Sequence, residues 1–424
     1  MRTLPVALLL LWLVSAERPL SEAERQRNID SFEYVWKTVR DKHWDPKLNG
    51  VDWQTVHDEL GPRIEKADST AQARAVMAEM LERLKQTHFG IIPAEAYEQM
   101  QPGTGSQAGT VGIDVRVIRG RVLVTSVEKA STAGAKGIRP GWELLAVDGQ
   151  ELGEVLRRVA KFFEKSTLEA LAGRAAVVYR LRGPPGSVVS LRLRNGQNQT
   201  VDLLVARTGQ RGVRAQFGFF PPMYVWSEWR KIGGSAGYLA FSMFMDPENV
   251  MKTAAEAITA CLACQGFIID LRGNPGGIGA MAMGLAGWFV EEKGLRLGAM
   301  QTRETALRFV VNPRPVTYRG PLAILVDGSS ASTAEIFSGG MKDLKRARIF
   351  GSRTAGAALP SVIEKLPNGD GFQFAIANYI SEGGQPLEGI GVIPDEEVEL
   401  TRETLLEGRD TVLEAALNWI KQHN

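Results

Sequence analysis

The sequence is poor in the residue types that most often build redox and metal sites. It holds two cysteines and four histidines in 424 residues. Two cysteines exclude a disulfide-built scaffold, and four histidines leave few candidates for acid–base chemistry. Lysine and arginine number 50 against 48 acidic residues, and this near balance excludes the broad basic surface typical of nucleic-acid-binding proteins. We therefore expect no cofactor, no metal and no nucleic-acid partner.

Long apolar runs are also scarce. The run Leu4–Val14 follows Met1-Arg2 and is too short to cross a bilayer comfortably. Small residues at Val14-Ser15-Ala16 are spaced as at a signal-peptide cleavage site. The pattern predicts a signal peptide over residues 1–16 and an exported protein, periplasmic or extracellular, without a membrane span after cleavage. An uncleaved anchor is the alternative.

The two cysteines form a single close pair. Cys261 and Cys264 follow a stretch of helical composition, so both thiols are expected to share one helix face. A zinc site would need a second such pair or paired histidines, and neither is nearby. Buried structural thiols and an export-compartment disulfide both stay open.

The rest of the chain divides into three parts, which predicts an α+β multidomain protein. Residues 17–100 show the i, i+3, i+4 apolar spacing of helices. Residues 107–207 alternate in the manner of strands, with turns at Arg119-Gly120 and Asn195-Gly196. Residues 215–424 alternate buried strands with helices, which predicts an α/β core around a mixed sheet.

Candidate chemistry gathers where one buried strand ends. Leu322–Val326 is followed by a run of small residues and then by a helix. Sites in open α/β sheets lie at the carboxyl ends of strands, and a serine at a helix start lies near the positive end of the helix dipole. Ser329, Ser330 and Ser332 are all candidate nucleophiles on this argument, with helix capping as the alternative role.

A second strand end carries adjacent glycines in Asp270-Leu-Arg-Gly-Asn-Pro-Gly-Gly277. Glycines let backbone N–H groups point into a site at close range, where they can stabilise an oxyanion. A phosphate cradle is disfavoured because the P-loop Gly-Lys-Ser/Thr ending is absent. Asp270 and Arg272 are expected to brace this loop.

The middle part resembles a PDZ domain of the bacterial protease type. The resemblance depends on Gly112-Ile113-Asp114, on Gly-Ile-Arg-Pro-Gly at 137–141, and on Leu-Leu-Ala-Val-Asp-Gly at 144–149. It implies that an extended peptide binds by strand addition, with its terminal carboxylate on the loop Val111, Gly112 and Ile113. The alternative is a small β-barrel with a structural role only.

The motifs together resemble the tail-specific (C-terminal processing) and tricorn-core serine proteases. The matching elements are the glycine loop, Ser-Ala-Ser-Thr-Ala-Glu-Ile-Phe at 330–337, and Glu-Gly-Ile-Gly-Val-Ile-Pro-Asp at 388–395. These elements, in this order and together with the PDZ-like part and the helical N-terminal part, cover almost the whole mature chain. The resemblance implies a ClpP/crotonase-like core, Ser332 as nucleophile, and an oxyanion hole from the N–H of Thr333 and of Gly276 or Gly277.

One departure selects the branch. The tail-specific proteases pair their serine with a lysine in a Gly-Lys-Gly element, and Ala357 occupies that position here. The tricorn branch instead uses a histidine from the N-terminal part and a glutamate near the C-terminal Pro-Asp. The matching residues are His88 as base and Glu388 as support, with Thr87 as the intervening hydroxyl residue.

Other titratable residues receive minor roles. Asp343 lies on the same helix face as Ser332 and is either a catalytic helper or an internal hydrogen-bonding group. The remaining histidines are expected at the surface; they are His43, His57 and His423. Three lysines lie near the core motifs without a pattern that brings them to the serine; they are Lys342, Lys345 and Lys365.

These observations favour an exported serine endopeptidase that hydrolyses peptides or unfolded proteins through an acyl-enzyme, with the PDZ-like part recognising substrate tails. Two alternatives remain. One is a catalytically inactive member that binds peptides or apolar ligands, because a fold alone does not establish hydrolysis. The other is a hydrolase of non-peptide acyl compounds. A homo-oligomer is possible.

Overall fold

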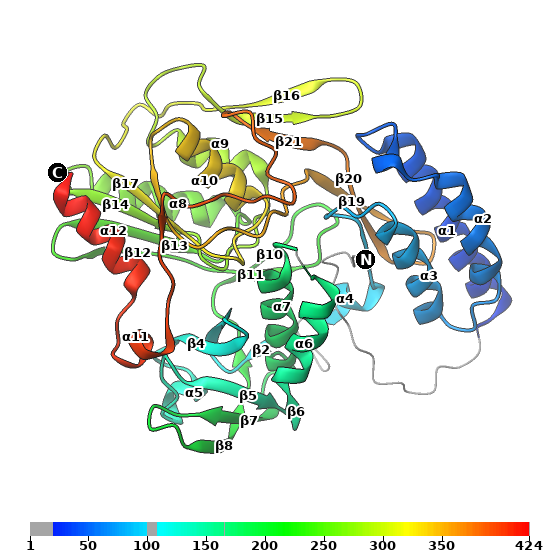
Figure 1. The fold of residues 1–424 in the computed structure, drawn as a ribbon, viewed down its shortest axis with the longest axis horizontal. Helices are drawn as coiled ribbons and strands as arrows, with labels where there is room; N and C mark the ends of the chain where they lie inside the picture. The colour runs from blue at the N-terminus through cyan, green and yellow to red at the C-terminus, as the bar shows by residue number, and fades with distance from the viewer. Residues whose placement is uncertain (1–19, 100–107, 165, 424) are drawn as a thin grey trace.

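The computed structural model describes residues 20–99, 108–164 and 166–423 (Figure 1). The predicted signal peptide, residues 1–16, lies outside the described residues. Within them, no helix is both long enough and apolar enough to cross a membrane.

Three helices form the N-terminal module: α1 (Glu22–Lys42), α2 (Trp53–Glu65) and α3 (Thr70–Glu82). Each begins at a capping side chain that accepts a hydrogen bond from the first turn, namely Ser21, Asp52 and Ser69. The indoles of Trp36 and Trp53 each donate to the other residue's carbonyl at 3.0 Å, which joins α1 to α2. The predicted helical spacing is confirmed.

The N-terminal module shares its hydrophobic core with a distant segment. Strand β1 (Gly90–Ile92) pairs antiparallel with β20 (Gly371–Ala375), which pairs with β19 (Ser361–Lys365). Phe372 and Phe374 pack among the buried side chains of α1, α2 and α3. The sequence pattern does not reveal this sharing, because the partners are separated by the whole middle part of the chain.

The middle unit is a sheet with two helices on it. Its strands run in the order β3-β4-β5-β7-β8, which leaves β3 and β8 at the ends. The strands are β3 (Ile113–Ile118), β4 (Arg121–Val127), β5 (Glu143–Val147), β7 (Val188–Arg194) and β8 (Thr200–Ala206). Both predicted hairpins are present. Helices α6 (Leu152–Phe162) and α7 (Glu169–Leu181) were not identified from the sequence.

The core is a mixed sheet, as predicted. Its strand order is β12-β13-β14-β17-β18-β22, with only the β12–β13 pair antiparallel. The strands are β12 (Ser227–Ile232), β13 (Ala236–Phe241), β14 (Gly266–Asp270), β17 (Leu322–Val326), β18 (Arg348–Gly351) and β22 (Glu396–Glu397).

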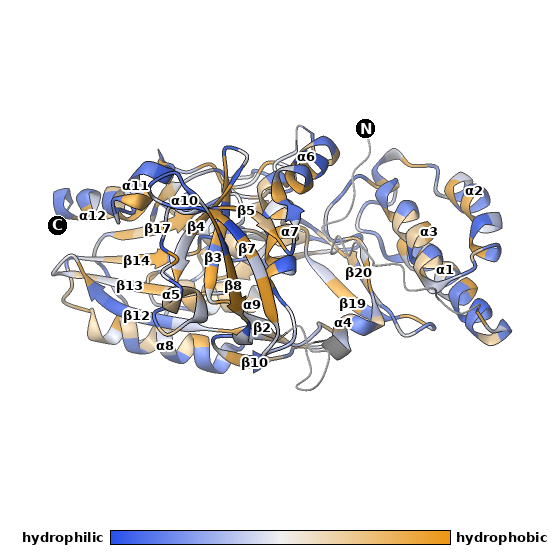
Figure 2. Ribbon diagram, turned by 90° about the horizontal axis from the view of Figure 1, so that it is seen from below, coloured by the Kyte–Doolittle hydropathy of each residue, from blue (hydrophilic) through white to orange (hydrophobic). Residues whose placement is uncertain are grey.

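Helices cover both faces of this sheet, and Figure 2 looks onto it with β12, β13, β14 and β17 side by side. Alternate residues of β13 and β14 pack on α12 (Thr411–Gln422), and the intervening residues face α8 (Pro247–Ala260), α9 (Gly279–Ala286) and α10 (Thr333–Asp343). A period of two along a doubly covered strand explains why these strands read as continuous apolar runs.

Shorter elements complete the described chain. They are η1 (Leu48–Gly50), α4 (Ala94–Gln99), β2 (Gly109–Thr110), α5 (Thr132–Ala135), β6 (Gln150–Glu151), β9 (Thr208–Gly209), β10 (Val213–Ala215), β11 (Met223–Val225), β15 (Arg296–Gln301), β16 (Ala306–Val310), β21 (Asn378–Ser381) and α11 (Arg402–Leu406).

Two expectations are wrong. His43 is not a surface residue: it is fully buried just after α1, while His423 is exposed. The two cysteines do not share a helix face, because α8 ends at Ala260 and the chain turns through both of them. Both are free thiols, and burial with the neighbouring Cys264 thiol raises the pKa of Cys261 to about 12.

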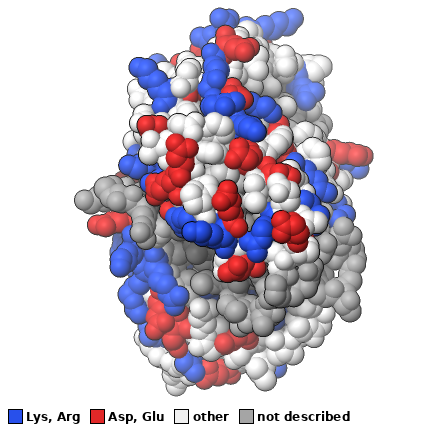
Figure 3. Space-filling model, turned by 90° about the vertical axis from the view of Figure 1, so that its right-hand side faces the viewer, with Lys and Arg blue, Asp and Glu red and all other residues white. Residues whose placement is uncertain are grey.

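Charge is mixed on the end of the molecule that the N-terminal helices form. Figure 3 shows acidic and basic side chains interspersed on this face. This distribution agrees with the near balance of charged residues in the sequence.

Candidate active site

Ser332 lies between strand β17 and helix α10, and its backbone is strained. Its φ of 54° is in the left-handed region, which is uncommon for a residue with a side chain. The backbone N–H of Ser332 lies 2.8 Å from the Ala357 carbonyl and 2.9 Å from Glu335 Oε2. These two acceptors hold the turn that presents Ser332 at the helix start.

The structure separates the three candidate serines. Ser330 is fully buried, and its hydroxyl donates to the Leu271 carbonyl at 2.7 Å. The backbone N–H of Ser329 donates to Asp327 Oδ1 at 2.8 Å, and this residue is also buried. Ser332 is the one of the three that is partly exposed. Ser330 therefore joins two loops, and Ser332 is the accessible hydroxyl.

The glycine loop lies directly against Ser332. A Cβ on Gly276 would lie 2.6 Å from Ser332 Cβ and 2.8 Å from the Thr333 nitrogen, so only glycine fits there. The Gly276 N–H donates to Asn274 Oδ1 at 3.0 Å. The Thr333 hydroxyl donates to the Gly277 carbonyl at 2.8 Å, which joins the loop to the helix start.

His88, Thr87 and Glu388 form one hydrogen-bonded chain. His88 Nδ1 lies 2.7 Å from Thr87 Oγ1, and this hydroxyl lies 2.8 Å from Glu388 Oε2. The Thr87 N–H also donates to Glu388 Oε1 at 2.8 Å. The structure thus brings Glu388 to the adjacent residues Thr87 and His88, although Glu388 lies 301 positions after Thr87 in the chain.

This chain determines the tautomer of His88. An ionised carboxylate only accepts hydrogen bonds, so the single Thr87 hydroxyl proton is directed at Glu388. The Thr87 oxygen then accepts from His88 Nδ1–H, which leaves Nε2 with a free lone pair. Burial lowers the pKa of His88 to about 4, so the ring is neutral at neutral pH. Burial outweighs three hydrogen bonds in raising the pKa of Glu388.

The segment Ala357-Ala358 connects the two halves of the site. The Ala357 carbonyl accepts from Ser332, and the Ala358 N–H donates to Glu388 Oε2 at 3.1 Å. Ala357 is buried and packs with Leu171 of α7 and with Ala331. The position that carries lysine in the tail-specific branch is therefore filled here by apolar packing.

Glu335 is a buried acid that the sequence analysis did not single out. It accepts from Ser332 N–H, from Gly356 N–H at 2.7 Å, from Ala357 N–H at 3.0 Å and from the Thr354 hydroxyl at 2.5 Å. Burial raises its pKa to about 7. The Ser-x-x-Glu spacing of a capping box was the available signal in the sequence.

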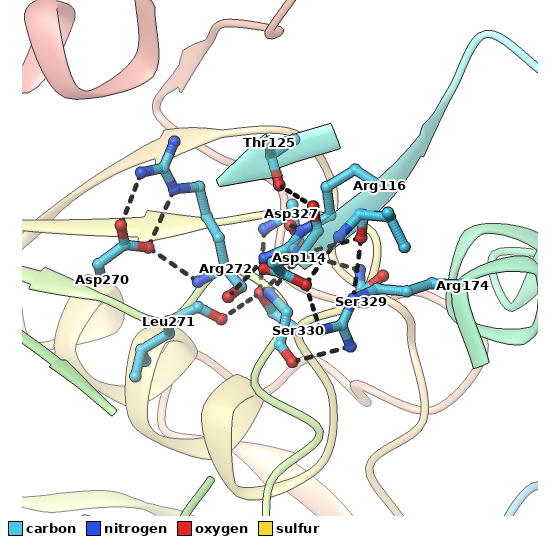
Figure 4. A network of polar contacts seen from close by, with 12 residues as sticks. Asp114, Arg116, Thr125, Arg174, Asp270, Leu271, Arg272, Asp327, Ser329 and Ser330 are labelled. Carbon is cyan, nitrogen blue, oxygen red and sulfur yellow. Dashed lines mark hydrogen bonds and ion pairs between the residues drawn. The ribbon is translucent and has the colours of Figure 1, made fainter. Parts of the chain in front are cut away.

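The middle unit reaches the same loops through Arg116 (Figure 4). Arg116 Nε lies 2.5 Å from Asp327 Oδ2, and its NH2 group donates to the Arg272 carbonyl at 3.0 Å. Asp327 Oδ1 in turn accepts from the Gly273 N–H at 2.9 Å. One side chain of β3 therefore contacts the start of both the serine loop and the glycine loop. The predicted bracing is confirmed, since Arg272 binds Asp270.

The predicted carboxylate loop lies at the start of β3, which is an end strand of its sheet. Val111 is fully buried, and its carbonyl accepts from Ala133 at 3.2 Å. A Cβ on Gly112, whose φ is 79°, would lie 2.2 Å from Ser131 Cβ. The loop is thus closely packed, and Ile113 begins strand β3.

Asp343 shows the internal role, because its carboxylate accepts the Gly383 N–H at 2.8 Å. Lys342 is likewise engaged, since its Nζ donates to the Ile393 carbonyl at 2.6 Å and pairs with Asp395. No cluster of three or more potential ligand side chains that could hold a metal ion occurs in the described ranges.

Sequence comparison finds two family matches and several relatives. Residues 235–398 match peptidase family S41, and residues 22–82 match the tricorn protease C1 domain. A carboxyl-terminal-processing protease of Synechocystis is 25% identical over 370 residues, with 86% of this chain and 79% of the relative covered. The chloroplastic carboxyl-terminal-processing peptidase 3 of Arabidopsis thaliana is 24% identical, with coverages of 89% and 70%.

Solved structures show the same fold. The photosystem II D1 C-terminal processing protease has a TM-score of 0.59 at 22% identity, covering 92% of this chain and 98% of that one. Mature CPAF has a TM-score of 0.64 at 16% identity, with coverages of 94% and 96%. The two family matches, at opposite ends of the three-part architecture, agree with the resemblance found in the motifs. The chain thus resembles peptidase family S41 over residues 235–398 and the carboxyl-terminal-processing proteases over most of its length, and these similarities indicate a serine peptidase.

Proposed function

We propose that this chain is an exported serine endopeptidase that cleaves peptides or unfolded proteins through an acyl-enzyme at Ser332. The observation that carries the proposal is the continuous hydrogen-bonded chain from Glu388 through Thr87 to His88. A serine hydroxyl is a poor nucleophile without a base. The three hydrogen-bonded residues supply that base as a neutral imidazole with a free Nε2.

In the proposed mechanism, His88 Nε2 takes the proton as Ser332 Oγ attacks the peptide carbonyl carbon. The imidazolium is stabilised through Thr87 by the carboxylate of Glu388. Collapse of the tetrahedral intermediate breaks the C–N bond, and His88 returns its proton to the leaving amine. Water then attacks the acyl-enzyme with His88 again as base, which releases the new carboxylate and restores Ser332.

Two backbone N–H groups would stabilise the oxyanion of this intermediate. Thr333 is the first residue of α10, so its N–H lies outside the helix's own hydrogen-bond ladder. Of the two glycines, Gly276 already donates to Asn274. That engagement favours Gly277, whose carbonyl is bound by the Thr333 hydroxyl, as the second donor.

Substrate tails would bind to the middle unit, which we propose is a PDZ domain. Strand β3 is an end strand, so an extended peptide could pair with it beyond the loop Val111, Gly112 and Ile113. The names of the relatives, which refer to carboxyl-terminal processing, support recognition of a chain end. We also propose a ClpP/crotonase-like core and a periplasmic or extracellular location, with a homo-oligomer possible.

The catalytically inactive alternative lacks support. The comparisons name processing proteases, and Ser332, His88 and Glu388 retain the residue types that hydrolysis requires. A hydrolase of non-peptide acyl compounds would use the same groups, so a substrate panel is needed to separate it from a peptidase.

Labelling with a fluorophosphonate probe tests the proposal. The wild type should be labelled, and Ser332→Ala should not. Ser329→Ala is the matched control, because it removes a hydroxyl from the same loop and should keep labelling. His88→Ala should label far more slowly and should cleave an unstructured peptide slowly or not at all. A folded wild type that neither labels nor cleaves would overturn the proposal.

A further inference from the structure

Beside the proposed base lies a second histidine for which the mechanism has no role. His43 is fully buried just after helix α1 and contacts the segment that carries His88. Its Nε2 lies 2.8 Å from Gln86 Oε1, and its ring stacks on Phe89 with centroids 5.4 Å apart and planes 15° apart. His43 thus contacts residues on both sides of Thr87 and His88.

Both ring nitrogens of His43 have polar partners. Nδ1 lies 3.0 Å from the Asp45 backbone nitrogen and 2.9 Å from the Asp45 carbonyl oxygen, and Nε2–H donates to Gln86 Oε1 at 2.8 Å. Burial lowers the pKa of His43, which keeps the ring neutral. The charged groups that face it are Asp45 and Arg303, one of each sign.

The core also holds His43 in place. Arg303 lies between strands β15 and β16, and its guanidinium donates to the carbonyls of Arg40, Asp41 and His43 at 2.9–3.1 Å. These carbonyls lie in the last turn of α1 and at its C-cap, where the helix itself supplies no partners. His43 is therefore fixed to the core through Arg303 and to the His88 segment through Gln86 and Phe89.

The His88 segment needs such support because its backbone is strained. His88 has a φ of 60°, a conformation that persists in non-glycine residues only when the surroundings enforce it. The same turn places the Thr87 hydroxyl between His88 and Glu388. A small change at Gln86 or Phe89 would move the base relative to Ser332.

We propose that His43 is a positioning residue for this reaction: its Nε2–H on Gln86 and its ring on Phe89 hold His88 in the conformation that aims the base. The inference rests on the proposed function, because it assumes that His88 is the base. It assigns His43 no contact with substrate.

A matched set of variants separates the two contacts. His43→Phe keeps a ring for Phe89 but removes the donor to Gln86. His43→Gln keeps a donor but removes the ring. We expect His43→Phe to lower kcat by about tenfold to a hundredfold with KM within about twofold of wild type, because misplacing a catalytic group costs rate more than ground-state binding. His43→Gln should recover part of this loss.

His57→Phe is the control. His57 is another histidine of the N-terminal module and is partly buried, but it packs on Phe32 and Trp36 and binds Glu33. It should keep wild-type kcat. Thermal unfolding of all variants shows whether the fold is retained. In a double-mutant cycle, Gln86→Ala should lower kcat and should add little to His43→Phe, because both remove the same contact.

The outcomes distinguish this inference from the proposed function. Wild-type hydrolysis by Ser332→Ala or by His88→Ala would overturn both. If those two variants are inactive while His43→Phe keeps wild-type kcat, only the positioning role fails. The positioning role also fails if His43→Phe and His57→Phe lose kcat equally, or if the effects of His43→Phe and Gln86→Ala are additive.

Discussion

The backbone N–H of Ser332 donates to the carbonyl of Ala357 at 2.8 Å, and Ala357 stands where the tail-specific branch carries its lysine. The position is therefore a backbone support for the serine and not a vacant place for a base. Its side chain lies against Leu171 and Ala331, which belong to the middle unit and to the serine loop.

Restoring the lysine should not restore a Ser-Lys pair. We expect Ala357→Lys to destabilise the fold by about 1–3 kcal/mol, because a long side chain must displace Leu171 from a packed contact. In the His88→Ala background, Ala357→Lys should leave peptide cleavage at the level of His88→Ala alone. Chemical denaturation and steady-state kinetics measure these effects. Recovery of cleavage by the double variant would show that a lysine at 357 reaches the serine.

Thr87 is expected to act through its hydroxyl. Thr87→Val preserves shape but removes the link between His88 and Glu388, so kcat should fall by about a hundredfold, within the range of general acid–base effects. Thr87→Ser keeps the hydroxyl and should retain most of kcat. The two variants should have similar melting temperatures. Equal loss of kcat in both would contradict a role for the hydroxyl alone, because Thr87→Ser keeps that group.

The acid side of the pH profile should reflect the low pKa of His88. The folded-state pKa of His88 is about 4, well below the ordinary value of about 6.5. His88 therefore stays an unprotonated base as pH falls through 6.5. We expect the acid limb of kcat/KM to have its midpoint below pH 6.5. Burial also raises the pKa of Glu388, so Glu388→Gln tests whether protonation of that carboxylate contributes to the limb. A midpoint at or above 6.5 that persists in Glu388→Gln would contradict this assignment.

The stability of the fold should depend on the ionisation of Glu335 and should fall as pH rises. Its folded pKa is raised to about 7, so the folded state binds this proton more tightly than the unfolded state does. The resulting stabilisation is full below the ordinary carboxyl pKa and is lost as pH rises from about 4.5 to about 7. Glu335→Gln cannot titrate and should lose this dependence in melting curves. It should also be less stable at every pH, since an amide nitrogen would face backbone donors.

The parts of the fold that depend on local pattern were predictable. Apolar spacing in the N-terminal part and continuous apolar runs in the core predicted the helices and strands. The order of the motifs identified Ser332, His88 and Glu388 as candidates for one site. His43 was misplaced because its partners lie far along the chain: its ring stacks on Phe89 and binds Gln86, and Arg303, 260 positions away, binds its carbonyl. The core shared with Phe372 and Phe374 was missed for the same reason.

The middle unit shows a different limit. Alternation predicted its hairpins, but α6 and α7 were not recognised within a stretch read as β-rich. Their absence from the prediction also hid Leu171, the α7 residue that packs on Ala357. The sequence alone shows that position 357 lacks the lysine. The reason that alanine fits this position, its packing with Leu171, appears only in the structure.

Arg116 should couple the middle unit to the site. It pairs with Asp114 and Asp327, and its environment excludes most solvent, so Arg116→Ala would remove the cation bound to Asp327 and leave Asp114 with Arg174 (Figure 4). Removing one partner of a buried ion pair typically costs about 3–5 kcal/mol. We expect a clear loss of stability and a lower kcat, because Asp327 also binds the N–H groups of Gly273 and Ser329. Thermal unfolding and peptide kinetics measure both effects.

Arg119→Ala is the matched control for Arg116. Arg119 lies in the turn between β3 and β4, is largely exposed, and pairs with Glu399 at 3.0 Å. Exposed pairs of this kind contribute about 0–1 kcal/mol, so this variant should remain close to wild type in both measurements. If Arg116→Ala behaved like Arg119→Ala, the contact of β3 with the serine loop and the glycine loop would have no part in maintaining the site.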